Sequence, residues 1–208
     1  MQFYPLKAPA TYPGHHLLVV AFAIAIVFGL YPFASLVLQQ NSYGFAISGA
    51  APDFELRDAE GKPRSLADYR GRHVYLMFGF MRCQETCHSQ VMNLVALADQ
   101  LDRTEIEFLY LAMDTRYDEP ALLKEYFDRR GKSFTSLHAQ NLQQMQSIAS
   151  AFNAGYRIAG NPGSDNYDIE HPARIFLIDP EGQLRFMYSG TTIDVVQIAA
   201  DFHQINRT

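Results

Sequence analysis

The stretch VYLMFGFMRCQETC, residues 74–87, decides the fold of this chain. Val74–Phe80 is a continuous apolar run of strand length and β-type composition, which is typical of a strand buried on both faces. The chain's only two cysteines, Cys83 and Cys87, follow it directly. Apolar residues then recur at helical spacing over Val91–Leu101. The pattern predicts a strand, a cysteine-containing loop and a helix, in that order.

The remaining residues supply the other elements of a thioredoxin-like plan. Periodicity and turn residues predict a β-hairpin at 54–66, a second buried strand at 106–113, helices from Glu119 and from Asn141, an irregular loop at 153–167, a strand pair at 175–188 and a helix at 193–205. The order is hairpin, β, α, β, α, α, β, β, α. We therefore expect an α/β thioredoxin-like fold, with a central mixed sheet flanked by helices and an N-terminal β-hairpin extension. In this plan a dithiol lies where the first central strand gives way to its helix.

An apolar segment precedes the predicted domain. Leu17–Leu38 is 22 residues without a charge, and roughly 20 apolar helical residues span a bilayer core. A cleavable signal is the alternative, but its apolar region runs only to about 15 residues. Because Lys7 is the only lysine or arginine before the segment, the positive-inside rule places residues 1–16 in the cytoplasm. Residues 39–51 are then a tether, and residues 52–208 form an extracytoplasmic domain.

Charge and cysteine content narrow the function. The net charge is −5, the isoelectric point is near 5.8, and no basic stripe alternates with aromatic residues. Nucleic-acid binding is therefore excluded, because phosphate contacts need a basic surface. Two neighbouring cysteines in an oxidising compartment indicate a switchable dithiol or a metal site rather than a disulfide scaffold.

The two cysteines form a CxxxC motif. We expect Cys83 in the loop and Cys87 in the first helical turn, where free N–H groups and the helix dipole stabilise a thiolate. Two thiolates are an incomplete metal site, so a third ligand is needed. His171 is the candidate, because the loop before the strand at 175 approaches the dithiol in this plan. His88 adjoins Cys87 but points about 100° away on the helix, which makes it a candidate for the surroundings of the site. Inert buried cysteines and a solvent-exposed loop histidine are the alternatives.

Three blocks carry a family resemblance. FGFMRCQETC (78–87), YLAMDTRYDEP (110–120) and YDIEHPARIFLIDPEG (167–182) resemble, in order and spacing, the signature blocks of the Sco/SenC/PrrC family of copper chaperones. The resemblance runs from about Pro52 to the C-terminus and includes the N-terminal anchor. It implies a protein of the bacterial inner membrane whose periplasmic domain binds one copper ion, Cu(I) or Cu(II). It also implies a role in assembling the binuclear copper centre of cytochrome c oxidase.

The resemblance assigns roles to individual residues. Matched one by one, the copper ligands become Cys83, Cys87 and His171, a soft set suited to Cu(I). Asp114 and Asp118 match the two acids of the family's D-x-x-x-D block. Asp114 is a candidate orienting or partner-facing residue, with a strand-end cap as the alternative. The copper-bearing subunit of cytochrome c oxidase and other copper chaperones are the implied partners.

The chain departs from the family pattern beside its ligands. Gln84 and His88 stand where the family usually has proline, which loosens the loop. A looser loop should either reduce the preorganisation of the metal site or favour thiol–disulfide exchange. Pro172 follows His171, where the family more often has a small polar residue; it stiffens the histidine's loop, and a cis bond there would match the proline that faces the dithiol in thioredoxins.

Two other functions use the same cysteines. In a thiol–disulfide oxidoreductase, Cys83 would attack and Cys87 would resolve the mixed disulfide, so that client cysteines are reduced. A peroxidase would need an arginine and a threonine near its cysteine; Arg82 and Thr86 are present, but their spacing is wrong. The sequence therefore favours a metallochaperone over an enzyme, with thiol–disulfide exchange as the alternative.

Overall fold

The computed structural model describes residues 15–30, 42–83, 86–101, 104–131, 134–161, 164 and 166–206. The chain divides into two compact units, Met1–Asn41 and Ser42–Thr208. The two units are described separately below.

The first unit contains helix α1 (His15–Ala25), which continues into a π-helical turn at Ile26–Leu30. Among the described residues, no helix combines the length and the apolar character needed to cross a membrane. The anchor predicted at 17–38 reaches beyond these elements, and its residues 31–38 lie outside the described part of the chain.

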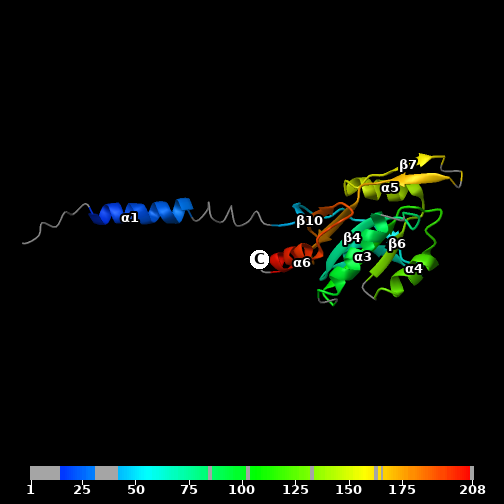
Figure 1. The fold of residues 1–208 in the computed structure, drawn as a ribbon, viewed down its shortest axis with the longest axis horizontal. Coiled ribbons are helices and arrows are strands. Elements are labelled where there is room, and N and C mark those ends of the chain that lie inside the picture. Colours follow the sequence, from blue (N-terminus) through cyan, green and yellow to red (C-terminus); the bar gives the residue numbers. More distant parts are fainter. Residues whose placement is uncertain are drawn as a thin grey trace, which may run out of the picture. The chain divides into compact units, whose positions relative to one another are not determined.

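The second unit is built on a mixed sheet (Figure 1). From edge to edge its strands within the described residues are β1 (Phe45–Ala46), β10 (Leu184–Ser189), β9 (Arg174–Ile178), β4 (His73–Gly79), β5 (Ile106–Ala112), β6 (Phe134–His138), β2 (Glu55–Arg57) and β3 (Pro63–Ser65). Strands β4, β5 and β6 are parallel, and the other neighbouring strands pair antiparallel. The predicted thioredoxin-like arrangement and the hairpin extension, β2–β3, are both present.

Both faces of the central strands are buried, as their continuous apolar sequence predicts. In β4, Tyr75 and Met77 belong to one core cluster, whereas Val74, Leu76 and Phe78 belong to the other. Strand β5 alternates in the same way along its length. The period of two therefore places one core on each side of the sheet.

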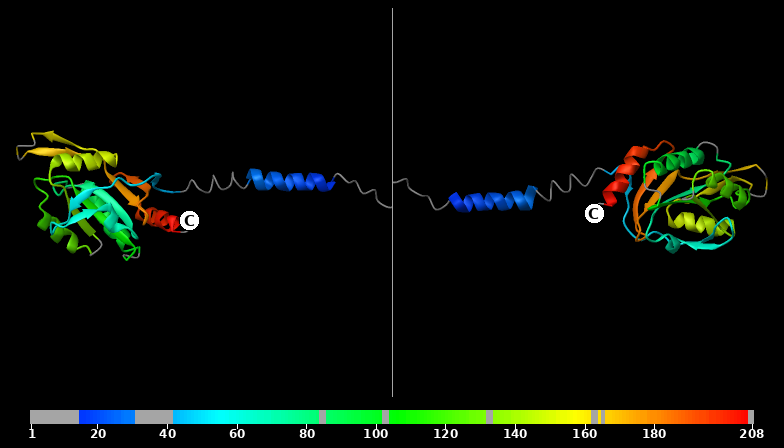
Figure 2. Two further views of the ribbon diagram at one scale, coloured as in Figure 1. Left: turned by 180° about the vertical axis from the view of Figure 1, so that it is seen from behind. Right: turned by 90° about the horizontal axis from the view of Figure 1, so that it is seen from below.

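Helices cover both faces (Figure 2). They are α3 (Thr86–Ala98), α4 (Pro120–Asp128), α5 (Leu142–Ala151) and α6 (Val195–Ile205), with a 3-10 helix, η2 (Leu66–Tyr69). Apolar residues of α3, α4 and α6 join the first core, and those of α5 and η2 join the second. Side chains cap two of these helices: Asn141 accepts from the Gln144 amide at 2.9 Å, and Asp194 accepts from the Val196 amide at 3.0 Å.

The structure has strands that the predicted order lacks. Strand β6 pairs with β5, although Thr135 and Ser136 weaken its apolar signal. The segment predicted as an irregular loop, 153–167, contains β7 (Arg157–Gly160), which forms a hairpin with β8 (Tyr167–Glu170). These two strands pair with each other in a separate sheet. Their half-exposed pattern gives little hydrophobic periodicity to read, so the prediction of a loop was wrong.

The segment predicted as a tether also differs from Ser42 onward. Strand β1 pairs with β10, and Ala51 donates to the Gly182 carbonyl at 2.9 Å. The amides of Tyr43 and Gly44 donate to the buried Asp201 carboxylate at 3.0 and 2.8 Å. We call residues 42–51 the strap. A strap held mainly by main-chain bonds carries no side-chain pattern, which is why the sequence suggested a linker.

Candidate metal centre

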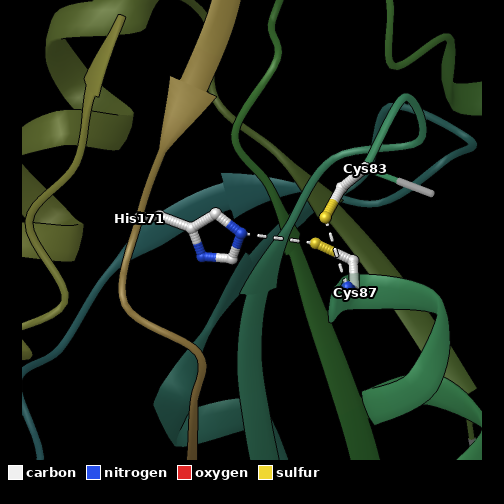
Figure 3. Close-up of side chains that lie close together, drawn as sticks. All are labelled: Cys83, Cys87 and His171. Carbon is white, nitrogen blue, oxygen red and sulfur yellow. Dashed lines mark hydrogen bonds between the residues drawn. The ribbon is translucent and has the colours of Figure 1, made fainter. Parts of the chain in front are cut away.

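The two cysteines lie where β4 gives way to α3. The chain leaves β4 at Gly79. Glycine is needed at this position because a Cβ would lie 2.6 Å from the Tyr110 ring. The chain then turns, with the Cys83 amide donating to the Phe80 carbonyl at 3.1 Å. Cys87 is buried in the first turn of α3 and donates its N–H to the Cys83 sulfur at 3.3 Å (Figure 3). The strand-to-helix step therefore places both sulfurs on one side of the loop, as predicted.

His171 reaches this pair from β8, directly after Glu170. Its Nε2 is 3.4 Å from the Cys87 sulfur, and its ring points at both sulfurs (Figure 3). Its Nδ1 is 3.2 Å from the Pro172 carbonyl oxygen. Because a carbonyl can only accept, Nδ1 carries the proton and Nε2 presents its lone pair to the sulfurs. The two sulfurs and one ring nitrogen of His171 lie within 4.8 Å of one another.

Burial sets the protonation of the site. It lowers the pKa of His171, so the imidazole is neutral at neutral pH. It also raises the pKa of the Cys87 thiol, with the hydrogen bond to Cys83 acting in the same direction. At the start of α3 the Cys87 N–H points at the Cys83 sulfur, while the Cys87 sulfur is itself buried.

The two predicted acids hold the loop that carries Cys83. Asp118 is buried and accepts from the Met81 amide at 2.8 Å, while burial raises its pKa to about 7. Asp114 is buried and forms a 3.1 Å ion pair with Arg82. Asp114 also accepts from two amides that follow it in the chain at 3.3 Å, so it caps the strand end as well. Neither acid belongs to the cluster of the two sulfurs and the imidazole.

The other residues singled out beside the cysteines occupy different positions. His88 is exposed, with its Nδ1 3.4 Å from the Tyr126 hydroxyl, and it lines a cavity of about 50 Å³ together with both cysteines. It is not part of the three-residue cluster. Gln84 lies outside the described residues. The described chain has no cis peptide bond, so the suggested cis bond before Pro172 is wrong.

Aromatic residues complete the surroundings, and the sequence analysis missed them. The Phe80 ring meets the His171 ring edge-on at 5.8 Å between centroids. The Tyr167 hydroxyl donates to Asp114 at 2.6 Å. Both belong to the quoted sequence blocks, but nothing in an aromatic residue's spacing shows that it faces a site rather than a core.

Comparisons with known proteins agree with this geometry. A family model described as SCO1/SenC matches residues 47–207. The SCO2-like protein of Rickettsia felis is 28% identical over 134 residues, which cover 63% of this chain and 65% of that protein, slightly less than two thirds of its length.

Solved structures share the fold. The solution structure of apo Sco1 from Thermus thermophilus is 24% identical, covers 79% of this chain and 97% of its own, and has a TM-score of 0.71. The copper-bound crystal structure of Arabidopsis thaliana ScoI is 20% identical, covers 77% of this chain and 100% of its own, and has a TM-score of 0.68. With its family model matched over most of the second unit and its fold shared with these structures, the chain belongs to the SCO1/SenC family.

Proposed function

We propose that this protein is a membrane-anchored copper-binding protein that holds one copper ion through Cys83, Cys87 and His171. Its role is to support the assembly of the binuclear copper centre of cytochrome c oxidase. The observation that carries the proposal is the convergence of two sulfurs and a neutral imidazole, although His171 lies 84 residues from Cys87 in the chain.

The donor set suits copper. Thiolates are soft ligands that favour Cu(I), and an imidazole nitrogen also suits Cu(II). Bonds from a first-row metal ion such as zinc to sulfur or nitrogen are about 2.0–2.3 Å, so its ligand atoms lie within roughly 4.6 Å of one another. The three atoms are within 4.8 Å already. The site therefore needs only a small adjustment and the loss of thiol protons to bind an ion.

Membership of the family supports the proposed client and location. Among the similar structures, that of Arabidopsis thaliana ScoI contains copper, and we assign the same cargo to this chain. We place residues 17–38 in the bacterial inner membrane with the second unit on the periplasmic side, where the copper-bearing oxidase subunit and other copper chaperones are accessible partners. Cargo would leave by ligand exchange, in which a partner's thiolates replace the protein's own ligands at the ion.

Titration of the full-length chain with Cu(I) and with Cu(II) tests the proposal. Wild type should bind one equivalent, and His171→Ala should bind more weakly because the site falls from three ligands to two. His203→Ala is the matched control, since His203 is exposed on α6. An absence of stoichiometric binding by wild type would refute the proposal. Equal affinity of wild type and His171→Ala would remove His171 from the site.

Thiol–disulfide exchange is the second candidate function. It is favoured by one observation, that both sulfurs lie within the same 4.8 Å cluster and neither is bridged. One similar structure, 19% identical with a TM-score of 0.62, is of BsSco, in which a disulfide switch was identified. A pure oxidoreductase has no use for the imidazole as a ligand, so His171→Ala would retain full activity towards a disulfide substrate and wild type would bind no copper.

A further inference from the structure

The hairpin that carries His171 is not built into the central sheet. Strands β7 and β8 pair only with each other within the described residues. His171 follows the last residue of β8, while Cys83 and Cys87 belong to the β4–α3 connection. The distance from the imidazole to the sulfurs therefore depends on what holds the hairpin against that connection on one side of His171. On the other side the chain enters the central sheet with β9 at Arg174.

Arg82 makes such a contact. Its guanidinium carbon is 4.2 Å from the centroid of the Tyr117 ring and 4.5 Å from that of the Tyr167 ring. Both distances are inside the roughly 6 Å at which a cation is attracted to an aromatic face. Arg82 directly precedes Cys83, and Tyr167 begins β8. One side chain thus joins the cysteine loop to the hairpin.

Asp114 also links Arg82 to Tyr167, through its buried carboxylate. It accepts from the Arg82 guanidinium at 3.1 Å and from the Tyr167 hydroxyl at 2.6 Å. Only 2% of the Asp114 side chain is exposed, against 35% for Arg82, so the carboxylate is shielded from solvent. Hydrogen bonds to a buried charge are the strong ones, because losing a partner leaves the charge unpaired. We call Arg82, Asp114, Tyr117 and Tyr167 the clamp.

The ends of the clamp are close to the ligands in the chain. Arg82 is next to Cys83, and Tyr167 lies four residues before His171. A strand of four residues, β8, transmits the position of Tyr167 to His171. Residues outside the ligand set that orient a ligand commonly change metal affinity 10–100-fold when they are replaced.

We propose that Arg82 is a positioning residue for the copper site, which fixes the His171 hairpin over the two cysteines through the clamp. This inference rests on the proposed copper binding for its affinity effect. The geometry of the clamp is independent of copper.

The first test uses the metal-free, full-length protein. Amide hydrogen exchange of β7 and β8 should become about tenfold faster in Arg82→Gln, since the cation–π contact to Tyr167 is lost together with the bond to Asp114, while exchange of α6 stays unchanged. Arg130→Gln is the matched control. It removes an equal charge stacked 3.5 Å from the Tyr126 ring on α4, away from the hairpin. Unchanged exchange of the hairpin in Arg82→Gln would overturn the proposal.

The second test is a double-mutant cycle on Cu(II) affinity. Arg82→Gln should weaken binding about 10–100-fold in wild type and have almost no effect in the His171→Ala background, because the clamp acts through His171. An equal loss in both backgrounds would show that Arg82 acts on the thiolates by its charge and would overturn positioning. Arg82→Lys keeps the charge but not the planar stack, so it should not restore wild-type affinity.

Failure of the proposed function and misfolding of the variant can each be distinguished from failure of the proposal about Arg82. If wild type binds no copper, the proposed function fails, whereas hydrogen exchange still decides whether Arg82 holds the hairpin. If Arg82→Gln does not fold, Tyr167→Phe replaces it, because that change removes only the hydroxyl bond to Asp114 and keeps the ring. Tyr167→Phe should speed exchange of the hairpin in the same direction, and unchanged exchange would contradict the clamp.

Discussion

At the scale of single residues, the two thiols of the site differ in their exposure to solvent. Cys83 is partly exposed and accepts the amide of Cys87, whereas Cys87 is buried. The first-turn amide of α3 thus donates to the outer sulfur, that of Cys83. The inner sulfur needs an ion to replace its proton. A metal ion or an incoming thiol therefore meets Cys83 first.

A substitution at Gly79 tests how closely the chain is packed where it leaves β4. Gly79→Ala should lower the free energy of unfolding by about 1–3 kcal/mol, because overpacking forces neighbouring groups to move, and the new Cβ would lie 2.6 Å from the Tyr110 ring. Urea denaturation measures the loss. Gly155→Ala is the control, since its Cβ would lie 3.5 Å from its nearest neighbour. Equal stability of Gly79→Ala and wild type would contradict this account of the close approach.

At the scale of elements, the strap completes an edge of the sheet. Its main chain bonds to β10 and to the Asp201 carboxylate. Without it, a buried carboxylate loses both of these donors and β10 becomes an exposed edge. The domain therefore begins at Ser42 rather than at Pro52, as the boundary between the two units also indicates.

The strap yields a prediction about truncation. A fragment of residues 42–208 should unfold at a higher temperature than a fragment of residues 52–208, because only the longer one satisfies Asp201. Differential scanning calorimetry of the two fragments measures the difference. Asp201→Asn in the longer fragment should reproduce most of the loss. The same melting temperature for both fragments would show that the strap is dispensable.

At the scale of the whole molecule, buried histidines couple stability to pH. Burial lowers the pKa of His73, which packs edge-on against Phe202 at 4.7 Å, and burial also lowers the pKa of His138. In the unfolded chain a histidine takes up a proton near pH 6.5. Since the unfolded state binds more protons at these two histidines below this value, their contribution to the free energy of unfolding falls as the pH falls below about 6.5. Asp118, whose pKa burial raises to about 7, acts in the opposite direction, because the folded state takes up its proton first.

Replacing one of these histidines should flatten that dependence. His73→Gln should lose less stability than wild type between pH 7 and pH 5, as measured by urea denaturation at both values. His203→Gln, on the exposed face of α6, should show the wild-type slope. A wild-type slope in His73→Gln would mean that His73 does not contribute to acid destabilisation.

Much of this architecture could be predicted from local pattern. Strands β4 and β5 are buried on both faces, so their apolar runs are unbroken, and Pro120 and Asn141 mark the starts of α4 and α5 by helix-start chemistry. The short, half-exposed strands β1, β7 and β8 carry no such pattern. Their existence depends on main-chain partners far along the chain, which periodicity does not report.

The metal site likewise has a part that local sequence predicts and a part that depends on contacts between distant segments. The sequence by itself determined the strand–CxxxC–helix unit, because a buried strand, a loop and an amphipathic helix are each written in local periodicity. The expected position of its loop made His171 the candidate third ligand, and the family resemblance supported it. Only the tertiary structure decided that the Nε2 atom of His171 faces the sulfurs, that the Cys87 thiol is buried, and that Arg82 joins the two halves of the site. These properties arise from contacts between distant segments, whose burial and orientation are set by packing and not by neighbours in the chain.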